Sequence, residues 1–204
     1  MIIDMRTYLL KPGTIAAYEE RFAEALPERL KFSKLGAFWH SEVGPLNRVI
    51  HVWPYESFEE RHRIYVEARK TGIWPPKGGD MLVTMEDKIV EPAPFSPPFE
   101  EKQLGNLYEI RTYTYQPGMI PQVIELWGKV IAERAKLSPL AACWYTVIGP
   151  LNQWIHIWPY KDLGERERVR AESLKIKGWP APTREWLVKQ ENVLVAPAAF
   201  SPLR

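Results

Sequence analysis

The sequence has little of several features on which common classes of protein depend. It contains a single cysteine, Cys143, in 204 residues, which excludes an intramolecular disulfide and a cysteine-cluster metal site. No apolar run approaches the roughly 20 residues that a membrane-spanning helix needs. The 27 basic and 25 acidic residues are mixed along the chain and leave a net charge of +2. The basic stripe of a nucleic-acid-binding protein is therefore absent.

Signals for targeting and for several common catalytic sites are also missing. The N-terminal residues lack the pattern of a signal or transit peptide. The chain has no phosphate-binding glycine loop and no nucleophile-elbow motif. No carboxylate or thiol stands at zinc-ligand spacing from a recurring histidine. We therefore expect a cytoplasmic protein with no metal, no cofactor and no nucleic-acid partner.

The sequence consists of two copies of one unit. Residues 1–99 align with residues 106–204 without a gap, and about two positions in five are identical. Motifs that recur include RTY, PG, GPLN, HxWPY and FSP. Each copy has the size of a small domain, and two copies are too few for a solenoid. We predict two domains, 1–99 and 106–204, that pack on each other.

Each copy shows six elements in the order β-α-β-β-α-β. Alternating or β-rich runs predict strands at 4–10, 37–43, 48–53 and 82–90, with equivalents in the second copy. Ser57 with Glu60, and Asp162 with Glu165, have the spacing of a capping box and predict the start of the second helix. This order is typical of a ferredoxin-like unit, in which both helices cover one face of an antiparallel sheet. The fold class is therefore α+β.

The first helix is expected to differ between the copies. In the second copy an apolar stripe runs from Ile120 to Ile131, and Pro121 falls in the first turn, where proline is tolerated. The first copy has a matching stripe that contains Pro27. Because an internal proline removes a hydrogen bond and clashes with the preceding turn, we predict a kink or an end at Pro27 and no interruption in the second copy.

The third strand of each copy is apolar on both faces. Val49, His51 and Trp53 alternate with Ile50 and Val52. The helices of a ferredoxin-like unit cover only one face, so the other face must be buried against a second sheet. We predict that the two sheets of this chain pack face to face and close an α/β barrel.

The motifs RTY, PG, GPLN and HxWPY together resemble the NIPSNAP family, and both copies carry them. The resemblance implies a tandem duplication and the fold of the dimeric α/β-barrel superfamily, here formed within one chain. It implies little about chemistry, because the activity of NIPSNAP proteins is poorly defined. Relatives in the superfamily include cofactor-free monooxygenases, isomerases and haem-binding enzymes, and the fold does not decide between them.

His51 and His156 are the histidines that recur, and they are the candidate catalytic residues. Each could transfer a proton or bind haem iron. The alternative is a structural histidine whose ring nitrogens bond to neighbouring backbone.

Arg6 with Tyr8, and Arg111 with Tyr113, are candidate ligand-binding pairs. An inward arginine could hold a carboxylate with two hydrogen bonds, with tyrosine as a second donor. The alternative is an arginine that pairs with a structural acid on the last strand, such as Glu86 or Glu191.

Tryptophans are the other candidate ligand-binding residues. Trp39, Trp74, Trp144 and Trp179, with Trp53 and Trp158, could line an apolar pocket between sheet and helices. The alternative is that they belong to the core. The charged run from Glu165 to Arg168 is typical of a solvated helix face.

Three classes of function follow from these patterns. The first is binding of a small apolar or aromatic molecule between a sheet and its helices. The second is a cofactor-free monooxygenase or isomerase, in which histidine acts as general base and arginine or tryptophan stabilises an enolate-like oxygen; haem binding through His51 or His156 is a variant. The third is an interaction module whose proline-rich arms, Pro92–Pro98 and Pro197–Pro202, dock on another subunit. Association of chains into a homo-oligomer is compatible with each class.

Overall fold

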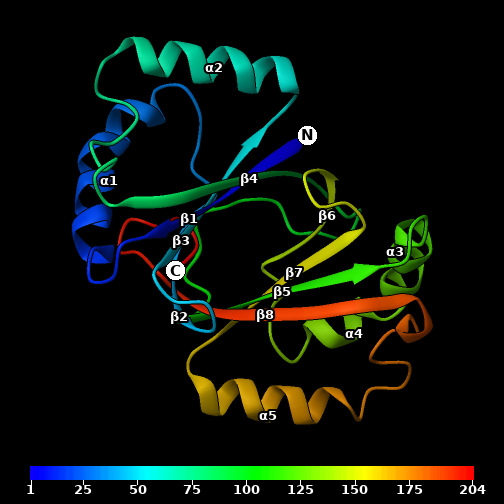
Figure 1. Cartoon of the computed structure of the whole chain (residues 1–204). Coiled ribbons are helices and arrows are strands. Elements are labelled where there is room, and N and C mark those ends of the chain that lie inside the picture. Colours follow the sequence, from blue (N-terminus) through cyan, green and yellow to red (C-terminus); the bar gives the residue numbers. More distant parts are fainter.

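The computed structural model describes residues 1–204 and contains one closed barrel of eight antiparallel strands (Figure 1). The strands are β1 (Ile2–Leu10), β2 (Ala37–Val43), β3 (Arg48–Tyr55) and β4 (Leu82–Pro92) in the first half, and β5 (Leu107–Tyr115), β6 (Ala142–Ile148), β7 (Gln153–Tyr160) and β8 (Leu187–Pro197) in the second. Within each half the order across the sheet is β4-β1-β3-β2 or β6-β7-β5-β8. Both halves therefore have the predicted ferredoxin-like topology.

The two sheets are joined at their edges. Strand β2 pairs with β8, and β4 pairs with β6, so the ring has no free edge. Beyond these strands each proline-rich arm lies on the opposite half. The backbone N–H of Phe38 donates to Ser201 Oγ at 2.9 Å, and that of Cys143 donates to Ser96 Oγ at 3.0 Å. The arms therefore dock within the chain.

The barrel interior is an apolar core to which both halves contribute. Sixteen buried residues form it, among them Ile50 and Val52 of β3. Val49, His51 and Trp53 of the same strand face the helices instead. The prediction that the duplicated chain buries the second face of each sheet with its own partner sheet is confirmed.

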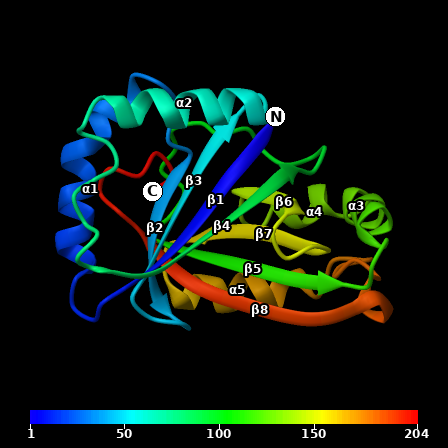
Figure 2. The same cartoon turned by 45° about the horizontal axis from the view of Figure 1, so that its top comes forward.

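The helices lie outside the barrel, as Figure 2 shows. They are α1 (Ile15–Leu30) and α2 (Phe58–Lys70) in the first half, and α3 (Ile120–Gly128), α4 (Ile131–Ala135) and α5 (Leu163–Ser173) in the second, followed by a 3-10 turn at Arg184–Trp186. Ser57 Oγ accepts a hydrogen bond from Glu60 N at 3.2 Å, and Asp162 Oδ1 accepts one from Glu165 N at 2.8 Å. The predicted caps of α2 and α5 are confirmed. Measured by length and apolar content together, none of the helices qualifies as a membrane span.

The prediction for the first helix of each copy is wrong. Helix α1 runs through Pro27 to Leu30, whereas the second copy is interrupted after Gly128 and resumes at Ile131. Pro27 lies in the last turn of α1, directly after the buried Ala25 and Leu26. Gly128 is the last residue of α3 and stands where α1 has Ala23, and glycine is about 1 kcal/mol less favourable than alanine inside a helix. The interruption of the second copy is therefore attributed to Gly128, while Pro27 leaves the helix of the first copy uninterrupted.

Candidate functional site

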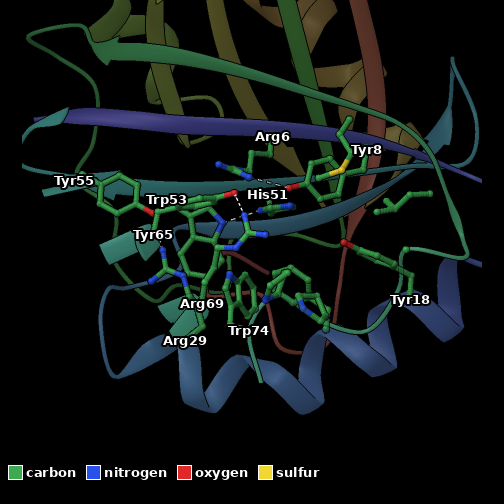
Figure 3. A pocket seen from close by; sticks show the side chains of 16 residues that line it. Arg6, Tyr8, Tyr18, Arg29, His51, Trp53, Tyr55, Tyr65, Arg69 and Trp74 are labelled. Atoms are coloured by element: carbon green, nitrogen blue, oxygen red, sulfur yellow. Dashed lines mark hydrogen bonds between the residues drawn. The ribbon is translucent and has the colours of Figure 1, made fainter. Parts of the chain in front are cut away.

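Each half contains a pocket between its sheet and its helices. The first pocket has a volume of about 420 Å³ and the second about 470 Å³. Figure 3 shows the first pocket, with side chains of the strands on one side and of α1 and the loop after α2 on the other. Volumes of this size are typical of sites for small molecules.

The two pockets are built from equivalent residues. Residues at equivalent positions in both include Arg6, Tyr8, Phe22, Arg29, His51, Trp53, Tyr55, Trp74, Pro75 and Leu82 in the first, and Arg111, Tyr113, Trp127, Arg134, His156, Trp158, Tyr160, Trp179, Pro180 and Leu187 in the second. The structure thus brings together the candidates Arg6, Tyr8, His51 and Trp74, and their second-copy equivalents. Strands β1 and β3 supply the first three, and the loop after α2 supplies the tryptophan.

One wall residue of the first pocket packs against the second half of the chain. The ring of Phe200, in the C-terminal arm, stacks on the pocket residue Phe22 with 5.6 Å between centroids and 12° between planes. Phe200 also contacts Phe38 of β2 edge-on at 5.0 Å. The docked arm therefore packs against a residue that lines the pocket.

Trp39 and Trp144 lie elsewhere, and their placement in these pockets is corrected. Both belong to the barrel interior, where they are 0% and 1% exposed. On β2 the neighbouring Phe38 faces the helices, so alternation along the strand turns Trp39 inward. These two tryptophans fill the space between the sheets and border neither pocket.

His51 and His156 are buried in the pocket walls. Each Nδ1 accepts a hydrogen bond from an indole Nε1–H at 2.7 Å, from Trp53 for His51 and from Trp158 for His156. The ring proton of each neutral imidazole is therefore on Nε2, which is buried and has no partner. The partners are tryptophan side chains, and the alternative prediction of backbone partners is wrong.

This arrangement suits neither a general base nor a haem ligand. Burial, together with the charge of Arg6, lowers the pKa of His51 to about 3, and burial lowers the pKa of His156 well below its usual value. Imidazoles that bind a metal normally donate the N–H of the other nitrogen to an acceptor, whereas Nδ1 here accepts. The residues around His51 do not fit a haem group.

We expect His40 to titrate differently from His51 and His156 in solution. Long-range ¹H–¹⁵N spectra should show His51 and His156 as neutral Nε2–H tautomers from pH 8 down to pH 5. The hydrogen bond that His40 Nδ1 donates to Glu19 Oε1 raises the pKa of His40, so His40 should titrate above its usual range. Protonation of His51 near pH 6.5 would contradict this assignment.

Arg6 and Arg111 form ion pairs, though not with Glu86 or Glu191; an acid on the last strand does pair with Arg6, since Arg6 Nη2 lies 3.4 Å from Asp87 Oδ2 of β4. Arg6 Nε lies 3.1 Å from Asp4 Oδ1, and Arg111 Nη1 lies 2.9 Å from Glu109 Oε1. The acids stand two positions earlier on the same strand and therefore on the same face. Glu86, proposed as a partner, borders a separate cavity at one end of the barrel, as does its equivalent Glu191.

A helix arginine also reaches each buried acid. Arg61 Nε lies 2.6 Å from Asp4 Oδ2, and Arg166 Nη2 lies 2.7 Å from Glu109 Oε1. Arg166 belongs to the charged run that the sequence assigns to a solvated face. Its contact with a buried carboxylate shows that α5 is fixed to the sheet through this residue.

In the first half a second acid joins this cluster. Burial and the adjacent Asp4 carboxyl raise the pKa of Asp87 to about 7, although Arg6 and Arg61 act to lower it. Burial also acts to raise the pKa of Asp4, but the hydrogen bond with Asp87 and the charges of Arg6 and Arg61 outweigh it, and that pKa is lowered. Asp87 is therefore the acid of the pair that keeps its proton longer.

The Asp87→Asn variant should change how stability depends on pH. Folded Asp87 binds its proton up to about pH 7, while the unfolded residue releases it near 3.8, so its contribution is complete below 3.8 and is lost as pH rises through 7. Asparagine stays neutral. We expect the variant to have a higher Tm than the wild type at pH 8, by about 2–4 °C. The difference should shrink by pH 5, and calorimetric melts at both pH values measure it.

The sequence interpretation missed the two arginines on which the pockets centre. Arg29 and Arg134 are 4% and 3% exposed and are the only buried arginines. Arg29 donates to Tyr55 Oη and Ser33 Oγ, both at 2.6 Å, and its guanidinium lies 4.4 Å from the Trp53 ring. Neither arginine forms an ion pair with an acid. Burial lowers the pKa of each.

Arg134 has an equivalent environment. Its guanidinium lies 4.0 Å from the ring of Trp158 and donates to Ser138 Oγ at 3.1 Å. The signal that could have found the pair is recurrence, since arginine, the serine four residues later and the tyrosine at Tyr55 or Tyr160 all repeat between the copies. A buried cation without an anion is costly, and buried charges in proteins are usually paired.

Comparison with known proteins agrees with the duplicated fold. The NIPSNAP family model matches residues 3–97 and 108–202. A NipSnap homolog of Dictyostelium discoideum is 29% identical over 182 residues, covering 87% of this chain and 78% of the relative. Human NipSnap homolog 3B is 27% identical over 215 residues, covering 98% and 85%.

Among solved structures, a monooxygenase-like protein of Lactobacillus acidophilus superposes with a TM-score of 0.70, covering 96% of this chain and 93% of that one. Its sequence is 7% identical, so the likeness concerns the fold alone. The sequence motifs, the closed ring of two ferredoxin-like halves and the family match in both copies agree. The chain belongs to the NIPSNAP family, as a tandem duplication of its domain.

Proposed function

We propose that each half binds a small aromatic or apolar molecule that carries an acidic group. The observation that supports this most strongly is the buried guanidinium of Arg29, and of Arg134, inside a pocket with aromatic walls and without a paired acid. A bound carboxylate would supply the missing negative charge. The two-pronged geometry of guanidinium matches a carboxylate, and such charge-assisted hydrogen bonds are among the strongest in proteins.

The walls favour a flat apolar body. Around Arg29 the rings of Trp53 and Trp74 lie 5.6 Å apart between centroids at an angle of 76°, and the Trp74 and Phe22 rings lie 5.2 Å apart at 82°. Edges and faces of these rings can contact an aromatic ligand in the stacked or edge-on arrangements that aromatic pairs prefer. The acidic group and the ring system would then contact different parts of one pocket.

Ligand binding explains the site better than the other two classes. A catalytic base is poorly served by His51, because its Nδ1 is occupied by Trp53 and its pKa is about 3. The interaction-module hypothesis relied on the proline-rich arms. Those arms already dock on the opposite half of the chain through Ser96 and Ser201.

Calorimetric titration of the full chain tests the proposal. We expect 2-naphthoate to bind at least about tenfold more tightly than its neutral analogue 2-naphthalenemethanol, since hydrogen bonds to charged groups contribute about 1.5–3 kcal/mol. The two compounds share their ring system and differ in charge. Equal affinity of the two compounds, or no binding of either, would contradict the proposal.

A further inference from the structure

The two pockets differ in charge although they share a common plan. In the first half, Arg6 and Arg61 face two acids. Arg61 Nε lies 2.6 Å from Asp4 Oδ2, Arg61 Nη2 lies 2.6 Å from Asp87 Oδ2, and Arg6 Nη2 lies 3.4 Å from the same Asp87 atom. Two arginines and two carboxylates are balanced. Arg29 is then the one buried cation of the first pocket that has no acid.

In the second half, three arginines share a single acid. Arg111, Arg166 and Arg170 lie 2.9, 2.7 and 3.6 Å from the carboxylate of Glu109. The position equivalent to Asp87 is Asn192, whose Nδ2 donates to Glu109 Oε1 at 2.9 Å. An amide therefore replaces the second carboxylate, and this cluster keeps a positive excess beside Arg134.

Two exchanges between the copies create the difference. Asn192 replaces the acid Asp87, and Arg170 replaces Tyr65 at the pocket wall. Each pocket also has one exposed arginine at its rim, Arg69 in the first and Arg184 in the second, so these two residues add no difference in charge between the pockets. When the adjoining ion clusters are counted with the lining residues and all acids are ionised, the second pocket therefore has two more positive charges around it than the first.

We infer that the second pocket takes a ligand with a doubly negative head group, whereas the first takes a single carboxylate. This inference rests on the proposed function. A phosphate monoester and a dicarboxylate both have the required charge and present several acceptor oxygens to arginine. Arg134 would hold one part of the head group from the buried side, and Arg111 and Arg170, which line the same pocket, would hold the other.

The test compares three probes with one ring system. These are 2-naphthoate, naphthalene-2,3-dicarboxylate and 2-naphthyl phosphate, titrated by calorimetry at pH 8, where the phosphate is doubly charged. The Arg29→Met chain reports the second pocket, and the Arg134→Met chain reports the first. In Arg29→Met we expect at least one dianion to bind about tenfold more tightly than naphthoate, the gain of one further charged hydrogen bond. The dianion that binds more tightly shows whether the head group is a phosphate or a dicarboxylate.

Two further variants test whether the extra positive charge causes the preference for a dianion. In the Arg29→Met background, Asn192→Asp restores the acid of the first half and Arg170→Tyr restores its neutral wall. Each should reduce the preference for the dianion, and each residue is exposed or half-buried, which favours retention of the fold. Thermal melts check that the fold is kept.

The outcomes separate this inference from the proposed function. Naphthoate binding in Arg29→Met without any preference for a dianion would overturn the inference and leave the proposed function in place. The same holds if Arg134→Met shows an equal preference, or if the preference survives both Asn192→Asp and Arg170→Tyr. Failure of all three probes to bind either variant or the wild type would overturn both.

Discussion

The double variant Arg29→Met/Arg134→Met should lose about 100-fold in affinity for 2-naphthoate and keep its Tm within about 3 °C of the wild type. Removal of one partner of a buried charged pair costs about 2–5 kcal/mol in binding, which explains the large effect on affinity. Stability should change little because neither arginine has an acid partner to leave behind. Methionine retains much of the apolar stem and avoids the cost of burying a charge.

The combination of these two results is diagnostic. Replacement of a structural arginine would destabilise the chain. An arginine that serves to bind a ligand instead lowers the stability of the ligand-free chain, so its replacement does not destabilise it. Calorimetric titration and calorimetric melts of the same samples measure both quantities. A Tm that falls by 10 °C or more, with naphthoate affinity unchanged, would contradict the assignment.

The chain supplies a matched control for this variant. Arg63 and its equivalent Arg168 are also helix arginines, but their side chains are 66% and 65% exposed and lie outside both pockets. Arg63→Met/Arg168→Met removes the same two charges from the protein. We expect its affinity for naphthoate to remain within about twofold of the wild type, because charges separated by solvent are screened.

The Trp144→Ala variant should lower the Tm by about 10 °C. Trp144 is 1% exposed in the barrel interior, and truncation of a buried tryptophan costs about 3–5 kcal/mol. In a chain of this size each kcal/mol shifts the Tm by about 2–4 °C. Leu151→Ala, at an exposed hairpin position, is the control and should leave the Tm within about 1 °C.

The shape of the unfolding transition carries further information. Because both halves fill the interior and each arm docks on the other half, the chain should unfold in a single transition, in the wild type and in Trp144→Ala. Differential scanning calorimetry distinguishes one transition from two. Two separate transitions, of which only one moves in the variant, would show that the halves are stable independently.

The architecture could be predicted from the sequence because one strand of each copy is apolar on both faces. A strand with Val49, His51 and Trp53 on one face and Ile50 and Val52 on the other has no solvent-facing side. The repeat supplied the second sheet, so a barrel closed within the chain was the physical solution. The caps at Ser57 and Asp162 could also be predicted from the sequence, since a capping box depends on residues only three positions apart.

The errors in the prediction concern choices that depend on tertiary contacts. The course of the first helix depends on the burial of Ala25 and Leu26 beside Pro27, which helix propensity does not include. The direction of Trp39 followed from the alternation of β2, whose register is set by its pairing with β3 and β8.

The candidate site was predicted only in part for the same reason. Arg6 and Tyr8 could be placed on one face of β1 from alternation alone. Arg29 was not recognised, because an arginine in an amphipathic helix usually lies in solvent. Its burial depends on how closely α1 lies against Trp53 and Tyr55, a distance that the sequence does not contain. Recurrence of a charged residue among apolar helix neighbours is the signal to use in other duplicated chains.

A crystal structure of the full chain with 2-naphthoate is the most direct test of the claim that the buried arginines hold an acidic ligand. We expect carboxylate oxygens within about 2.7–2.9 Å of the Arg29 guanidinium in the first pocket, with the naphthyl ring against Trp53 and Trp74. A naphthoate whose carboxylate points to solvent, or one bound outside both pockets while Arg29 keeps only its contacts to Tyr55 and Ser33, would contradict it.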